Sequence, residues 1–127
     1  MTESPFPFQE LVGYHLEQGD GRCVAWVDID ERHMNPNGVV HGAVLFALVD
    51  TAMGGATSSV MQDGSWCATI DVNIRYFAPC LSGRVVAEVT VRRAGRRIVH
   101  LDGVVRDEDG KEYASATGTY AVIAAPT

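Results

Sequence analysis

The 127-residue chain has few cysteines, a single lysine and no long apolar segment. Its three cysteines are an odd number with no C-x-x-C spacing, which argues against a disulfide framework and favours a reducing compartment. The chain has neither a basic leader nor an apolar stretch long enough to cross a membrane. We therefore expect a cytoplasmic protein that does not associate with membranes.

Positive charge is scarce as well, and the formal net charge is -6. A nucleic-acid binder normally carries a net basic domain or a coherent basic face, so we expect no nucleic-acid partner. The four histidines, at positions 15, 33, 41 and 100, do not have the spacing of metal ligands. The sequence therefore predicts no metal site and no cofactor.

The length suits one domain over residues 1–127, large enough to bury about two thirds of its unfolded surface without a disulfide or a structural metal. The apolar pattern predicts a short helix at 8–12, a strand at 24–29, a polar loop at 30–38, and strands at 66–77, 84–93, 96–106 and 111–122. It also predicts a long helix from His41, which Gly54-Gly55 with Thr57, Ser58 and Ser59 end. Short turns between the last four strands indicate an antiparallel meander. The fold class that fits is α+β, with one central helix against a curved antiparallel sheet of five or six strands.

The strand predicted at 66–77 has one apolar and one unusually polar face. Alternation places these residues on the apolar face: Ala68, Ile70, Val72, Ile74 and Tyr76. The opposite face receives Thr69, Asp71, Asn73 and Arg75. One face should therefore pack and the other should not.

Asp50 is the first functional candidate, because it lies in the middle of the only long apolar helix pattern. An ionised group removed from water without partners costs roughly several kcal/mol. The nearest basic residues in sequence, Arg32 and Arg75, lie well outside the segment. A partner for Asp50 should therefore come from another part of the fold or from a second subunit.

The helical rotation separates Asp50 from the apolar stripe. At about 100° per residue, one stripe contains Leu45, Leu48, Val49, Ala52, Met53 and Ala56, and the far side groups Asp50 with Ala43, Ala47, Gly54 and Thr57. The small residues would allow another backbone to come close, which indicates a cleft or a subunit boundary. The alternative is that this face is exposed and Asp50 is a surface residue.

The segment before the helix contains residues whose spacing from Asp50 makes the signal for a functional site specific. Asn35, Gly38, His41 and Gly42 form a polar loop that runs into the helix start, with Asp50 eight residues after Gly42. A helix N-terminus presents unpaired N–H groups and a partial charge of about +0.5, so the Gly42 amide can bind a carbonyl oxygen or a developing oxyanion.

This spacing, Asn35-Pro-Asn-Gly38-Val-Val-His41-Gly42-Ala43 followed by Asp50, resembles the hotdog-fold acyl-CoA thioesterases of the phenylacetate-pathway (PaaI-like) type. The resemblance extends over nearly the whole chain, including the segment Thr69-Ile-Asp-Val-Asn-Ile-Arg-Tyr-Phe-Ala-Pro79. It implies a hotdog fold and hydrolysis of acyl-CoA thioesters to free acid and CoA, with CoA as part of the substrate.

The resemblance also implies roles for individual residues. Asp50 would be the nucleophile or the general base, Gly42 the oxyanion amide, and Asn35 would orient the thioester or the water. Thr69 would border the pocket from the neighbouring subunit, and His41 would be an optional helper. The family forms homodimers or homotetramers with sites at the dimer interface. Where it usually has His-Gly-Gly, this chain has Ala43 after Gly42, and the added methyl group either narrows the acyl pocket or has no effect.

Four arginines bracket the turn Ala94-Gly95, namely Arg92, Arg93, Arg96 and Arg97. One interpretation is a solvated hairpin tip. The other is a clamp for the CoA phosphates, because the planar guanidinium group suits phosphate.

The same fold could carry a hydratase or dehydratase, or a non-catalytic acyl-CoA-binding module. The acyl group could be aryl, arylacetyl or medium-chain, and Phe46, Met53 and Phe77 could form an aromatic wall or simply pack in the core.

Overall fold

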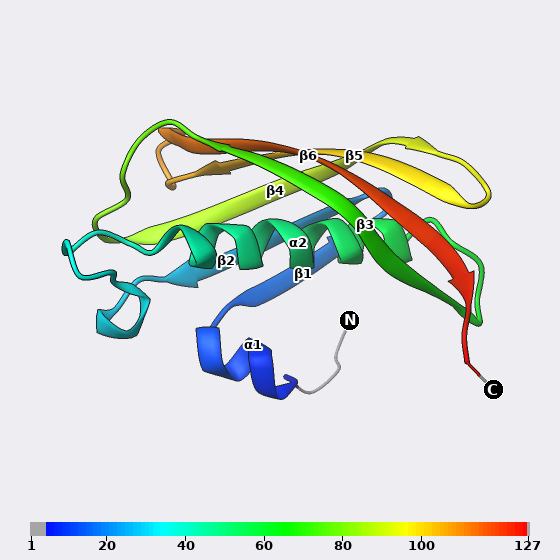
Figure 1. The fold of residues 1–127 in the computed structure, drawn as a ribbon, viewed down its shortest axis with the longest axis horizontal. Coiled ribbons are helices and arrows are strands. Elements are labelled where there is room, and N and C mark those ends of the chain that lie inside the picture. The colour runs from blue at the N-terminus through cyan, green and yellow to red at the C-terminus, as the bar shows by residue number, and fades with distance from the viewer. Residues whose placement is uncertain (1–4, 127) are drawn as a thin grey trace.

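The computed structural model describes residues 5–126, in which a six-stranded antiparallel sheet curves around one long helix, α2 (Gly42–Ser58) (Figure 1). The strands are β1 (His15–Gly19), β2 (Arg22–Asp28), β3 (Ser65–Tyr76), β4 (Arg84–Ala94), β5 (Ile98–Arg106) and β6 (Glu112–Ala124). Their spatial order is β1-β2-β4-β5-β6-β3. The predicted α+β class and the hotdog arrangement of helix and sheet are confirmed.

Helix α2 begins and ends close to the predicted positions. The His41 side chain caps it by accepting a hydrogen bond from the Ala43 amide at 2.9 Å. The predicted apolar stripe is buried, and Thr57, which the rotation placed on the Asp50 side, is buried too. Of the residues predicted to end the helix, Ser58 is the last helical residue and Ser59 the cap, whereas Gly54 and Gly55 lie inside the helix. A Cβ at Gly55 would lie 2.6 Å from Cys23 Sγ, so this glycine permits close packing of β2 against the helix.

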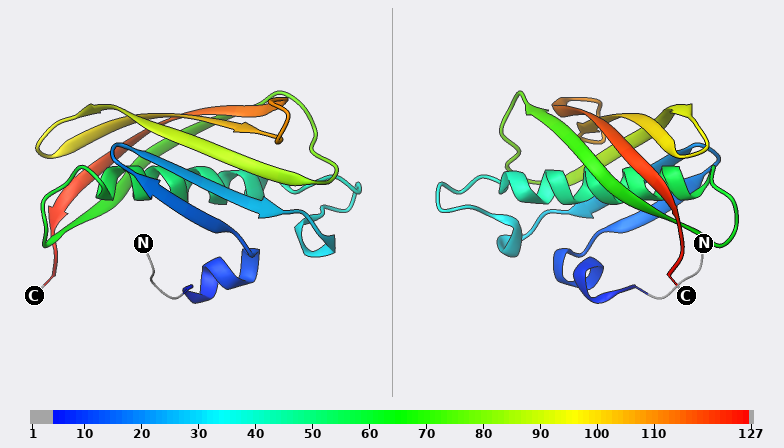
Figure 2. Two further views of the ribbon diagram at one scale, coloured as in Figure 1. Left: turned by 180° about the vertical axis from the view of Figure 1, so that it is seen from behind. Right: turned by 45° about the vertical axis from the view of Figure 1, so that its right-hand side comes forward.

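The N-terminal half contains one strand that the sequence did not predict. β1 pairs with β2 in a hairpin, but Leu16 is its only apolar residue, so it gives no apolar alternation. The helix predicted at 8–12 is confirmed as α1 (Pro7–Val12), which lies beyond β1 (Figure 2). Its last carbonyls are bound by the loop that leads to α2, because Arg32 donates to the Leu11 carbonyl and His33 Nε2 lies 2.6 Å from the Val12 carbonyl.

The predicted four-strand meander is correct for β4, β5 and β6 and wrong for β3. β3 pairs with β6 at the edge of the sheet, and residues 77–83 lead from it to β4 in the interior. The prediction failed because strands adjacent in sequence were assumed to be adjacent in space. Since β3 is an edge strand, one side of its backbone has no partner strand within residues 5–126.

A β-bulge in β3 overturns the predicted faces for the residues up to Ile70, whereas Val72 and Ile74 pack against the core as predicted. Thr69 pairs with Tyr120 and Asp71 pairs with Thr119, so Ile70 is an extra residue without a partner. The bulge reverses the alternation, so Thr69 faces α2 on the same side as Val72, while Ile70 is 53% exposed. Thr69 therefore reaches the helix that carries Asp50.

Candidate active site

Asp50 is half-buried and is held by two hydroxyl groups. Thr69 Oγ1 donates to Asp50 Oδ1 at 2.9 Å, and the Tyr120 hydroxyl donates to the same oxygen. No ion pair to Asp50 is formed within residues 5–126. The prediction that its partners come from elsewhere in the fold is confirmed, and the alternative of a fully exposed Asp50 is wrong.

Tyr120 is a residue of this cluster that the sequence did not single out. Its side chain is 2% exposed, and its hydroxyl also lies 2.9 Å from the Asp50 carbonyl oxygen. Burial, and then the hydrogen bond to Asp50, raise the pKa of Tyr120 far above its ordinary value. The hydroxyl therefore stays protonated, and remains a hydrogen-bond donor, at neutral pH.

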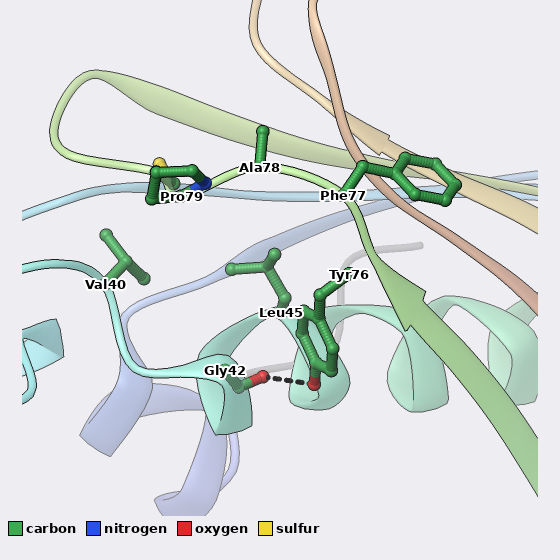
Figure 3. A pocket seen from close by; sticks show the side chains of 8 residues that line it. Val40, Gly42, Leu45, Tyr76, Phe77, Ala78 and Pro79 are labelled. Carbon is green, nitrogen blue, oxygen red and sulfur yellow. Dashed lines mark hydrogen bonds between the residues drawn. The ribbon is translucent and has the colours of Figure 1, made fainter.

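Gly42 occupies the other end of the candidate site, at the N-terminus of α2. Its N–H forms no hydrogen bond with any group in the described part of the chain, whereas its carbonyl accepts one from the Tyr76 hydroxyl at 2.8 Å (Figure 3). A Cβ at position 42 would lie 3.3 Å from the Tyr76 ring, so a larger residue would press on that ring. This free N–H can therefore donate a hydrogen bond to an oxyanion.

A pocket of about 330 Å³ opens beside Gly42. It is lined by Val40, Gly42, Leu45, Tyr76, Phe77, Ala78, Pro79 and Cys80. In Figure 3 the Tyr76 side chain extends toward Gly42, whereas the Phe77 ring points away from Val40 and Leu45. Of the three residues that could form an aromatic wall or pack in the core, Met53 is buried in the core, Phe77 lines this pocket, and Phe46 is exposed and does not line it.

Asn35 and His41 lie in the loop around the same helix end, and both are engaged locally. Asn35 Oδ1 accepts hydrogen bonds from the amides of Asn37 at 2.9 Å and Val39 at 3.3 Å. Gly38 has a φ of +78°, a conformation that glycine adopts readily. These contacts close the loop that presents the N-terminus of α2.

Within one chain, the predicted site is divided into two parts. Gly42 and Asp50 are eight residues apart on α2, which is about 12 Å along the helix axis. His41 directly precedes Gly42, Asn35 belongs to the loop that leads to it, and Thr69 bonds to Asp50 of its own chain. One carbonyl group cannot contact the Gly42 amide and the Asp50 carboxylate of the same chain.

Comparison with known proteins identifies the family. Residues 37–114 match the model of the thioesterase superfamily. The chain belongs to this superfamily. A solved thioesterase structure from Haemophilus influenzae has 30% sequence identity and a TM-score of 0.86, over 92% of this chain and 82% of that one. This enzyme is therefore a thioester hydrolase and not a non-catalytic binding module.

Two further relatives have descriptions that concern substrates. A phenylacetic acid degradation-related protein from Ralstonia eutropha has 25% identity and a TM-score of 0.83, over 94% of this chain and 93% of its own. The medium/long-chain acyl-CoA thioesterase YigI from Salmonella typhimurium is 27% identical, over 91% of this chain and 85% of its own. The predicted resemblance to phenylacetate-pathway thioesterases is confirmed at the level of the family.

The arginine-rich turn of this thioesterase is not close to Gly42 in the same chain. Arg92 forms an ion pair with Asp102 at 3.1 Å, and Arg93, Arg96 and Arg97 are exposed. The β4–β5 turn lies near residues 60–65, which follow the C-terminal end of α2, opposite to Gly42 (Figure 1). A role in binding CoA thus stays a prediction.

The histidines and acids of the thioesterase are dispersed. Among residues 5–126, no three His, Cys, Asp or Glu side chains form a group that could hold a metal ion. In the same range, no helix has both the length and the apolar character needed to cross a membrane.

Proposed function

We propose that this thioesterase hydrolyses acyl-CoA thioesters to the free acid and CoA, with Asp50 as nucleophile or general base. The observation that carries the proposal is a half-buried carboxylate, fixed by Thr69 and Tyr120, on the same helix as the open Gly42 amide. The acyl-CoA thioesterase activity named for the Salmonella relative supports this substrate class.

The Gly42 amide would bind the thioester carbonyl oxygen, and the positive end of α2 would stabilise the charge that develops there. In one route, Asp50 attacks the acyl carbon and the C–S bond breaks, which gives a mixed anhydride that water then hydrolyses. In the other route, Asp50 takes a proton from a water molecule that attacks the same carbon. CoA leaves as a thiolate in both routes and is then protonated. His41, which caps the helix, and Asn35, in the loop before it, would help to orient the thioester.

A second copy of the chain would complete the site. The distance of about 12 Å between Gly42 and Asp50 along α2 is too long for one carbonyl to bridge, whereas two antiparallel helices can bring Gly42 of one subunit to Asp50 of the other. The free edge of β3 supports this arrangement, since an unpaired edge strand that also exposes Trp66 and Ile70 suits pairing with another copy. We therefore propose a homodimer, alone or within a homotetramer.

The pocket beside Gly42 is the best candidate for the acyl group. Val40, Leu45 and Pro79 make it largely apolar, and its volume of about 330 Å³ would accept an aryl, arylacetyl or medium-chain group. The description of the Ralstonia relative supports the arylacetyl alternative. Ala43 is exposed and does not line the pocket, which argues that its extra methyl group leaves this pocket unchanged.

A panel of CoA thioesters with a thiol-reactive reporter tests the proposal. We expect thiol release from phenylacetyl-, benzoyl- or octanoyl-CoA, with kcat/KM at least about tenfold above that for acetyl-CoA, because a small acyl group leaves the pocket unfilled. Crotonyl-CoA serves as the control for hydration. Loss of its enoyl absorbance without thiol release would contradict hydrolysis as the reaction.

A further inference from the structure

The two oxygens of the Asp50 carboxylate have different surroundings. Oδ1 accepts hydrogen bonds from both Thr69 and Tyr120, whereas Oδ2 accepts none from the described residues 5–126. In water, rotation of the carboxylate makes its two oxygens equivalent. Here the two donors distinguish them.

The two donors come from directly opposed positions in the sheet. Thr69 of β3 and Tyr120 of β6 are cross-strand partners, and the bulge at Ile70 immediately follows this pair. In an antiparallel sheet, the side chains of such a pair project on the same face within about 5.5 Å of each other. The sheet thus presents two hydroxyl groups side by side above the middle of α2.

The Tyr120 donor is held firmly at both ends. Its ring is buried in the core, and its hydroxyl contacts the side chain and the main-chain carbonyl of Asp50. These two contacts restrict how the hydroxyl, and with it the Asp50 carboxylate, can turn.

We propose that Tyr120, together with Thr69, is a positioning residue that fixes Oδ1 of Asp50 and leaves Oδ2 as the oxygen that reacts. This inference rests on the proposed function. In the nucleophilic route, a bond forms between Oδ2 and the acyl carbon while the C–S bond breaks and CoA departs with the electron pair. In the general-base route, Oδ2 takes the proton of the attacking water. Both routes need one oxygen at a fixed distance from the carbonyl carbon, and a misplacement of about 1 Å can cost about a hundredfold in rate.

The test compares hydroxyl deletions in steady-state assays with the best substrate of the panel. Tyr120→Phe should lower kcat by about tenfold or more and leave KM within about twofold, because the carboxylate loses orientation but the substrate loses no contact. Thr69→Val should also lower kcat, and Thr69→Ser, which keeps the hydroxyl, should restore it.

Tyr14→Phe is the matched control. Tyr14 is as buried as Tyr120, and its hydroxyl also bonds to α2, but at Thr51, which donates to it at 3.2 Å. Its loss should leave kcat within about twofold, since its hydroxyl bonds to no atom of Asp50.

Each outcome decides the inference. If Asp50→Asn abolishes turnover while Tyr120→Phe and Thr69→Val retain the wild-type kcat, the positioning role is wrong and the proposed function stands. If Asp50→Asn itself retains turnover, the proposed function fails first. If Tyr120→Phe does not fold, the exposed position of Thr69 allows the Thr69→Val and Thr69→Ser pair to decide alone.

Discussion

The middle of α2 and its N-terminal end differ in how their polar groups are satisfied. In the middle, Asp50 is fixed by Thr69 and Tyr120 against the sheet. At the end, the Gly42 amide is open and a largely apolar pocket lies beside it. One helix thus carries a carboxylate that is fixed by hydrogen bonds and, about 12 Å away along its axis, a free N–H that can bind a carbonyl oxygen. Within one chain, these two groups are too far apart to contact the same carbonyl group.

Substitution of Asp50, in the middle of α2, should reduce turnover the most. Asp50→Asn should lower kcat by about a thousandfold, because the amide can accept the hydrogen bonds of Thr69 and Tyr120 but is neither a nucleophile nor a base. Thiol release measures the loss, and an unchanged Tm shows that the fold is retained. Asp63→Asn, in an exposed turn, is the control and should retain full turnover. Normal turnover by Asp50→Asn would remove the carboxylate from the chemistry.

Substitution of Gly42, at the N-terminal end of α2, should cause the next largest loss of turnover. Gly42→Pro removes the N–H at a position where helices accept proline, and should lower kcat by about a hundredfold. Gly42→Ala is the matched control, because it adds a Cβ near Tyr76 but retains the amide, so its loss should be much smaller. Equal losses in both variants would show that crowding of Tyr76, and not the amide, explains the defect.

The two regions differed in how far the sequence alone could predict them. Gly42 and Asp50 belong to a local pattern, in which a loop, a helix start and an apolar period follow each other along the chain. Their elements were therefore predicted close to their observed bounds. The burial of Met53 in the core follows from the same period.

Tyr120 could not be assigned in the same way. In the strand pattern at 111–122 it resembles any core tyrosine, and it meets Asp50 only because the sheet that contains β6 curves around α2. The bulge at Ile70 depends on that cross-strand pairing too, so strict alternation placed Thr69 on the wrong face. The sequence does contain one signal for such a residue. No cation lies near Asp50 in sequence, so its carboxylate requires neutral hydrogen-bond donors from elsewhere in the fold.

Within one chain, the β4–β5 turn lies near the end of α2 opposite to Gly42, and substitutions there should reduce activity least. Arg93→Glu and Arg96→Glu should raise KM by severalfold with little change in kcat, because contacts with the CoA phosphates would persist through the reaction. Lys111→Glu makes the same charge change at another exposed turn and should leave KM unchanged. An unchanged KM in the arginine variants would identify the turn as ordinary solvated surface.

The most direct measurement mixes subunits of the two inactive variants, Asp50→Asn and Gly42→Pro, after unfolding and refolding them together. If Gly42 of one subunit acts with Asp50 of the other, random pairing makes half of the dimers mixed, each with one intact site, so about a quarter of wild-type activity should return. If both groups act within a single chain, every mixed dimer lacks a complete site and activity should stay at the level of the separate variants. That second result would contradict the account.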